Sequence, residues 1–143
     1  MIAALLVLTG LAHAQEPVTA PHPQPTSSQR ALYEALKPRE DAPDCASLGA
    51  HSTDLAADLL WIVDHATQPP WVGVRAAQCI IKHHHTGQAD RIKTWMTNPN
   101  QRGLAILAMG LLDELPQELS AELAEAALAG PLADDAKKYI ALP

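Results

Sequence analysis

Proline and glycine divide most of this chain into short segments, and their spacing constrains the fold more than any other feature. Within the segments, apolar residues recur three, four, seven and eight positions apart, which is the period of an amphipathic helix. Proline fits the first turn of a helix but breaks a helix interior, so each segment must be a separate helix. The pattern therefore predicts an all-α fold. We expect helices over residues 28–37, 54–66, 70–85, 88–97, 99–113, 117–129 and 132–142.

The last six expected helices form three pairs, and only a few residues connect the two helices of each pair. Connections this short require the two helices to lie antiparallel, as a hairpin. Hairpins repeated about every 30 residues are typical of an α-solenoid, in which each hairpin stacks on the next. We therefore expect a solenoid of about three helical hairpins, preceded by one additional N-terminal helix.

The second helix of each hairpin carries a recurring motif. Its clearest copy consists of Asn98, Pro99, Arg102, Ala105, Ala108 and Gly110. A looser copy consists of Pro70, Val74, Arg75, Ala76, Ala77 and Ile80, and a third copy, without arginine, of Pro131, Ala136 and Ile140. Over residues 52–143 this pattern resembles HEAT-type repeats of the short bacterial kind. The resemblance implies a scaffold that binds another protein through a curved surface.

Charge and motifs exclude several classes of function. The chain has 10 Lys and Arg against 16 Asp and Glu, a net charge of -6, and its basic residues are dispersed. Because phosphate binding needs clustered basic residues, we expect no nucleic-acid partner. The sequence contains no serine-nucleophile motif, no zinc-protease motif and no glycine-rich phosphate loop. We therefore expect no catalysis and no cofactor.

The N-terminal residues suggest export from the cytoplasm. Residues 2–11 are an apolar run, followed by the small-x-small sequence of Ala12, His13 and Ala14 that a signal peptidase cleaves. The run is too short to span a bilayer, so we expect a signal peptide over residues 1–14 and no stable membrane insertion after cleavage. Residues 15–27 form a Pro-rich tether, and residues 28–143 form the repeat domain. The expected location is periplasmic or secreted.

Export also determines how the two cysteines are interpreted. In an oxidising compartment, Cys45 and Cys79 are the only possible intrachain pair. A disulfide between them would attach the segment before the first hairpin to the second helix of that hairpin. Two free thiols, or a metal-binding role for Cys79, are the alternatives.

Three consecutive histidines, His83, His84 and His85, lie at the expected end of helix 70–85. Histidine in the last turn of a helix can bind free carbonyl groups and interacts favourably with the helix dipole, and this is the preferred interpretation. The alternative is a metal-binding protein. In that case, His51 faces the cluster across the first hairpin and the four residues bind a divalent transition metal.

Three residues are candidates for contact with a partner protein. Trp71 directly follows a turn proline, where a large aromatic side chain is expected to be partly exposed. Arg75 and Arg102 lie at similar points of successive repeats, so we expect each to pair with an acidic residue of the adjacent hairpin. Binding the partner is the alternative for both.

The helix over residues 117–129 has an acidic outer face, which we interpret as solvated or as a contact for a basic partner. This face consists of Glu118, Glu122 and Glu125.

Overall fold

The computed structural model describes residues 23–140, and all secondary structure in that range is helical, which confirms the all-α prediction. The first helix, α1 (Ser27–Leu36), begins one residue earlier than expected. Its start is set by a capping box: the Thr26 side chain accepts a hydrogen bond from the Gln29 amide, and the Gln29 side chain accepts one from the Thr26 amide. Ser27 thus belongs to the helix and not to the Pro-rich tether.

A short helical segment that we did not expect follows α1. It consists of α2 (Cys45–Leu48) and the 3-10 turn η1 (Gly49–His51). Asp44 caps α2 by accepting a hydrogen bond of 2.8 Å from the Ser47 amide. A helix of four residues is too short to show an apolar period, so periodicity could not reveal it.

The first hairpin consists of α3 (Leu55–His65) and α4 (Pro70–His83). Asp54 caps α3, and its carboxylate accepts a hydrogen bond from the Ala57 amide. Pro70 starts α4, as expected for a proline in the first turn. The helix ends two residues before the predicted limit, and Gly87 adopts φ 78° in the following turn.

The second and third hairpins differ from prediction in their lengths. The second consists of α5 (Ala89–Thr97) and α6 (Arg102–Gly110). The single helix expected over 99–113 is in fact interrupted: α6 lies between two 3-10 turns, η2 (Pro99–Gln101) and η3 (Leu112–Glu114). In the third hairpin, α7 (Gln117–Ala129) has the predicted limits. Its partner α8 (Ala133–Tyr139) is shorter than expected, although residues 141 and 142 lie outside the described range.

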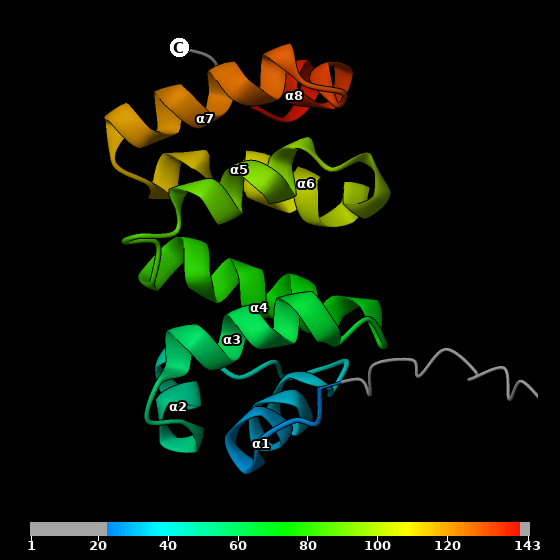
Figure 1. The fold of residues 1–143 in the computed structure, drawn as a ribbon, viewed down its shortest axis with the longest axis vertical. Coiled ribbons are helices and arrows are strands. Elements are labelled where there is room, and N and C mark those ends of the chain that lie inside the picture. The colour runs from blue at the N-terminus through cyan, green and yellow to red at the C-terminus, as the bar shows by residue number, and fades with distance from the viewer. Residues whose placement is uncertain (1–22, 141–143) are drawn as a thin grey trace, which may run out of the picture.

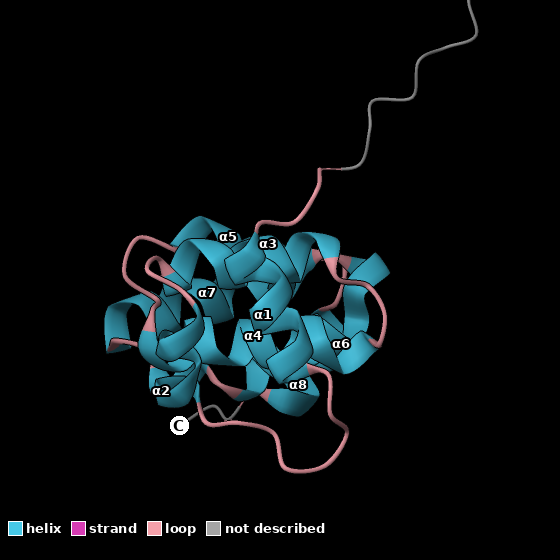
Figure 2. Ribbon diagram, turned by 90° about the horizontal axis from the view of Figure 1, so that it is seen from below, coloured by secondary structure: helices cyan, strands magenta, loops and turns pink. Residues whose placement is uncertain are grey.

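The helix pairs form successive layers along the longest axis of the molecule (Figure 1). Within layers, α3 packs on α4, α5 on α6, and α7 on α8. Between layers, α4 contacts α6, α6 contacts α8, and α5 contacts α7, while α1 contacts α3 and α4. The view along this axis shows that loops connect the helices at the periphery of the stack (Figure 2).

Small side chains are buried in the helices that contact one another between layers. The alanines of the recurring motif are fully buried in α4, α6 and α8. They are Ala76, Ala77, Ala105, Ala108 and Ala136. Because alanine projects only a methyl group, it lets neighbouring helices approach closely while larger residues such as Ile80 and Met109 fill the remaining space. In the part of the chain that the structure describes, no polar or charged residue is buried.

The expected signal peptide and residues 15–22 of the tether lie outside the described residues. No helix within residues 23–140 has both the length and the apolar character needed to cross a bilayer.

Candidate functional site

Trp71 holds α1 against the first hairpin. Its indole Nε1 donates a hydrogen bond of 3.0 Å to the carbonyl oxygen of Lys37, and its ring is partly buried against the core. Tyr33 of α1 makes a second contact between the same parts of the fold. Its hydroxyl donates a hydrogen bond of 2.7 Å to the carbonyl oxygen of Gln68, in the turn between α3 and α4. Trp71 thus has an intrachain role, whereas its contact with a partner stays a prediction.

Arg75 binds the C-terminal end of α1. Its Nη1 donates hydrogen bonds to the carbonyl oxygens of Leu36, at 2.8 Å, and of Pro38, while Nη2 donates one of 3.0 Å to that of Arg39. The last carbonyl groups of a helix have no partner within the helix. The guanidinium of Arg75 binds one of them, that of Leu36, together with the carbonyl groups of Pro38 and Arg39 just beyond the helix. The partner of Arg75 is therefore the backbone and not the acidic side chain that we expected.

Arg102 does pair with an acidic residue of the adjacent hairpin, as predicted. Its Nε and Nη2 donate hydrogen bonds of 2.9 and 2.7 Å to the two carboxylate oxygens of Asp135, so α6 is joined to α8.

An ion pair that we did not expect joins the first two hairpins. Nη1 of Arg91 in α5 donates a hydrogen bond of 2.6 Å to the carboxylate of Asp64 in α3. The two residues are 27 positions apart in sequence, and the packing of the second hairpin on the first brings them together.

The predicted disulfide between Cys45 and Cys79 is confirmed. The two Cα atoms are 5.5 Å apart and 34 residues apart in sequence, and the bond joins the first residue of α2 to the middle of α4. Cys79 is buried and Cys45 is half-buried. The segment before the first hairpin is therefore attached to it covalently.

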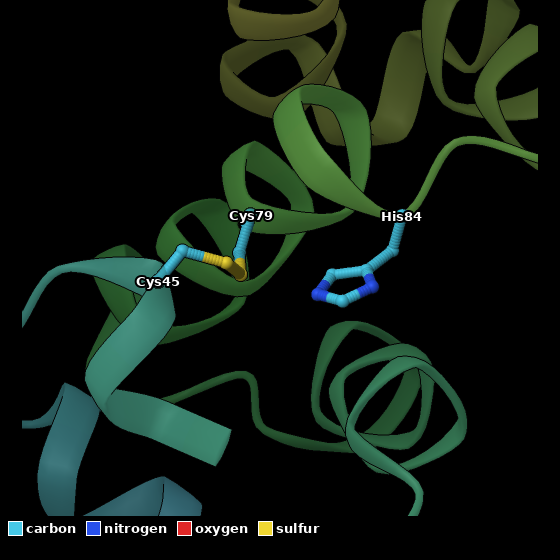
Figure 3. A group of neighbouring side chains, drawn as sticks. All are labelled: Cys45, Cys79 and His84. Atoms are coloured by element: carbon cyan, nitrogen blue, oxygen red, sulfur yellow. A yellow bond between two sulfur atoms is a disulfide. The ribbon is translucent and has the colours of Figure 1, made fainter.

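The structure separates the four histidines of the metal hypothesis. His51 is exposed at the end of η1 and His83 is exposed at the end of α4. The ring Nδ1 of His85 donates to the carbonyl oxygen of Ile81 at 3.2 Å, which is the contact expected of a capping histidine. His84 is instead grouped with Cys45 and Cys79, and the imidazole points towards the disulfide (Figure 3). A metal site formed by the histidine cluster with His51 stays a prediction.

A groove of about 760 Å³ runs along one face of α7. Side chains from the ends of α6, η3 and α8 form its other walls. It exists because α7 has 13 residues and α8 only 7, which gives lengths of roughly 20 and 10 Å. The shorter helix leaves part of α7 uncovered. This groove was not expected, because the sequence predicts a last helix that extends to residue 142.

The groove is apolar, with acidic groups among its lining residues. Ala121, Ala124 and Leu128 lie along its α7 side, and Tyr139, which is 36% exposed, lies at the end of α8. The carboxylates are those of Asp113 and Glu125, and the acidic residues Glu118 and Glu122 are exposed elsewhere on α7. This arrangement suits a ligand that has both apolar and positively charged groups.

We expect Arg75→Lys to destabilise the protein by about 1–2 kcal/mol, because a lysine ammonium cannot reproduce the fork of hydrogen bonds to three carbonyl groups. Urea unfolding measures the loss, and hydrogen exchange should show faster exchange of the amides of α1. Arg30→Lys, an exposed position on α1, is the control and should change little. Equal stability of the two variants would contradict the role assigned to Arg75.

We expect Cys45→Ala combined with Cys79→Ala to lower the free energy of unfolding by about 4 kcal/mol, the chain-entropy value for a closed loop of this length. Urea unfolding of the oxidised protein and of the double variant measures the difference. A reductant should destabilise the natural protein and leave the double variant unchanged. A reductant that affects both proteins equally would show that its effect does not arise from this bond.

Asp135→Asn should destabilise the third hairpin in a pH-dependent manner. The hydrogen bonds from Arg102 lower the pKa of Asp135 below its ordinary value of 3.8. The ionised carboxylate therefore stabilises the folded state fully when the pH is above the ordinary pKa of 3.8. This contribution is lost as the pH falls through the lowered pKa of the folded state. The thermal midpoints of the variant and the natural protein should differ at pH 7 and converge in acid. Asp134→Asn, an exposed neighbour, is the control.

The chain was compared with protein-family models, with curated proteins and with solved structures. None of these comparisons finds a match. The function proposed below therefore depends on the geometry and chemistry of this chain alone.

Proposed function

We propose that this protein is an exported HEAT-like repeat scaffold that binds another protein without catalysing a reaction. The observation that carries the proposal is the open apolar groove along α7, with the exposed ring of Tyr139 at its edge. Aromatic residues at the edge of an apolar groove are typical anchors of protein interfaces.

Several contacts support the repeat architecture. Neighbouring hairpins contact each other through their second helices, α4 with α6 and α6 with α8, and also through α5 with α7. Each second helix carries fully buried alanine of the recurring motif. Ion pairs join neighbouring hairpins at both junctions, through Arg91 with Asp64 and through Arg102 with Asp135. In repeat proteins of this kind each unit contacts only its neighbours, and the extended surface that results serves for binding.

The chemistry of the groove defines the partner. Its apolar side requires a segment with apolar side chains at helical spacing, and α7 is long enough to contact about three turns of a helix. The carboxylates of Asp113 and Glu125 favour lysine or arginine beside those apolar positions. We therefore propose an amphipathic, basic helical segment as the bound part of the partner.

The disulfide supports the proposed location. Disulfides persist in oxidising compartments and are rare in the cytosol of most organisms. A bond that joins α2 to α4 therefore fits a periplasmic or secreted protein, as does the signal peptide inferred from residues 1–14.

A displayed library of random peptides tests the groove directly. Selection on the purified, oxidised protein should enrich peptides with apolar residues at helical spacing and with lysine or arginine between them. Titration calorimetry of one selected peptide should give a dissociation constant that rises with salt concentration, because salt screens the contacts with Asp113 and Glu125.

Two matched pairs of variants locate the binding site. Ala121→Glu places a charged side chain in the groove and should abolish binding, whereas Ala57→Glu changes an exposed alanine of α3 and should not. Glu125→Lys should weaken binding by about tenfold, as expected for loss of a favourable charge contact, and Glu34→Lys on α1 should not. Unchanged binding to Ala121→Glu, or enrichment of acidic peptides, would overturn the proposal.

A further inference from the structure

Two cysteines and one histidine present their ligand atoms to one another at the junction of α2 and α4. The sulfur atoms of Cys45 and Cys79 and a ring nitrogen of His84 all lie within 4.8 Å of one another. Figure 3 shows the His84 ring directed towards the two sulfurs from the end of α4. Cys79 and His84 both lie in the C-terminal part of α4, His84 as its C-cap, whereas Cys45 begins α2. The tertiary structure therefore brings the third ligand to a pair that one helix already holds.

The backbone holds His84 in this position. Its amide donates a hydrogen bond of 2.8 Å to the carbonyl oxygen of Ile80, which makes His84 the C-cap of α4. Among the described residues, the ring of His85 has a hydrogen-bond partner, whereas the ring of His84 has none. The imidazole of His84 is therefore half-buried beside the cysteines with its nitrogens available as ligands.

The spacing of the three groups suits a tetrahedral metal ion. Zinc bonds of about 2.3 Å to sulfur and about 2.0 Å to nitrogen put tetrahedral ligand atoms roughly 3.5–3.8 Å apart. Sulfur atoms of two reduced cysteines separate to that distance by rotation about their Cα–Cβ bonds. The Cα atoms, 5.5 Å apart, do not have to move.

An ion can reach the cysteines from solvent. A cavity of about 320 Å³ lies beside Cys45 and Cys79, and Asp44 and His83 are among its lining residues. Lys82 and Arg75 also line it. The guanidinium of Arg75 is bound to backbone carbonyl groups, and two thiolates would outweigh the single charge of Lys82.

We propose that the reduced protein binds one divalent, thiophilic metal ion, such as Zn²⁺, through Cys45, Cys79 and His84. A dithiol reductant transfers two electrons and two protons to the disulfide, giving two thiols, and is itself oxidised to a cyclic disulfide. As the ion binds, both thiols release their protons to solvent, and the neutral imidazole of His84 supplies the third ligand. A water molecule completes the tetrahedron, and the metal does not change its oxidation state.

The disulfide and the metal site are therefore mutually exclusive states of the same two sulfur atoms. In the oxidised protein the sulfurs are bonded to each other and no thiolate is available to an ion. In the reduced protein the metal replaces the covalent link between α2 and α4. This inference does not depend on the proposed binding of a protein partner at α7, which lies on another hairpin.

Titration of the full chain with Co²⁺ and Zn²⁺ tests the proposal. The protein is reduced with dithiothreitol, freed of reductant under argon and compared with the oxidised protein. The reduced protein should bind one Co²⁺, with a thiolate-to-cobalt charge-transfer band and the visible absorption of a tetrahedral site, and Zn²⁺ should displace it. The oxidised protein should show neither band.

His84→Ala should weaken Co²⁺ binding by reduced protein about tenfold or more, since it removes one ligand while leaving the disulfide of the oxidised protein intact. His51→Ala, at an exposed histidine outside the cavity beside the cysteines, is the matched control and should bind as the natural protein does. Circular dichroism of the reduced protein checks its fold, and Zn²⁺ should raise its thermal midpoint. Absence of binding, an equal affinity of the His84→Ala variant, or no change in thermal midpoint with Zn²⁺ would overturn the proposal.

Discussion

Within the described residues, the helices of this protein bury their apolar sides both against the other helix of the pair and against the neighbouring pair. The second helices of the three pairs, which contact one another in succession, each carry fully buried alanine, as in Ala76, Ala105 and Ala136. A larger side chain at any of these points would push two layers apart, because protein interiors have little free volume.

Three arginines connect successive layers in addition to the apolar contacts. Arg75 joins the first hairpin to α1, Arg91 joins the second hairpin to the first, and Arg102 joins the second to the third. Surface ion pairs contribute little stability singly, and the more important effect here is on geometry. A bidentate contact such as that of Arg102 fixes the relative positions of two helices that alanine contacts alone would allow to slide.

Most features that the sequence predicted depend on local patterns, and the long-range exceptions are the disulfide and the pairing of Arg102 with an acidic residue of the adjacent hairpin. Pro70 and the apolar period predicted α4, and the limits of α7 agree with the structure. The sequence did not reveal α2, which is too short for a period, or the interruption of helix 99–113 by 3-10 turns. The groove and the position of His84 beside the cysteines depend on where α8 and α4 end, and packing determines such ends more than propensity does.

The two ends of the stack are closed in different ways. At the N-terminal end, a covalent bond and the hydrogen bonds of Trp71 and Arg75 hold α1 and α2 to the first hairpin. At the C-terminal end of the described residues, the last layer consists of α7 and the 7-residue α8, which no disulfide holds in place. Local opening in a stacked protein begins where the fewest contacts must break, so α8 is the part that frays first. A segment bound along α7 would slow this fraying, so occupancy of the groove and the lifetime of the last layer are coupled.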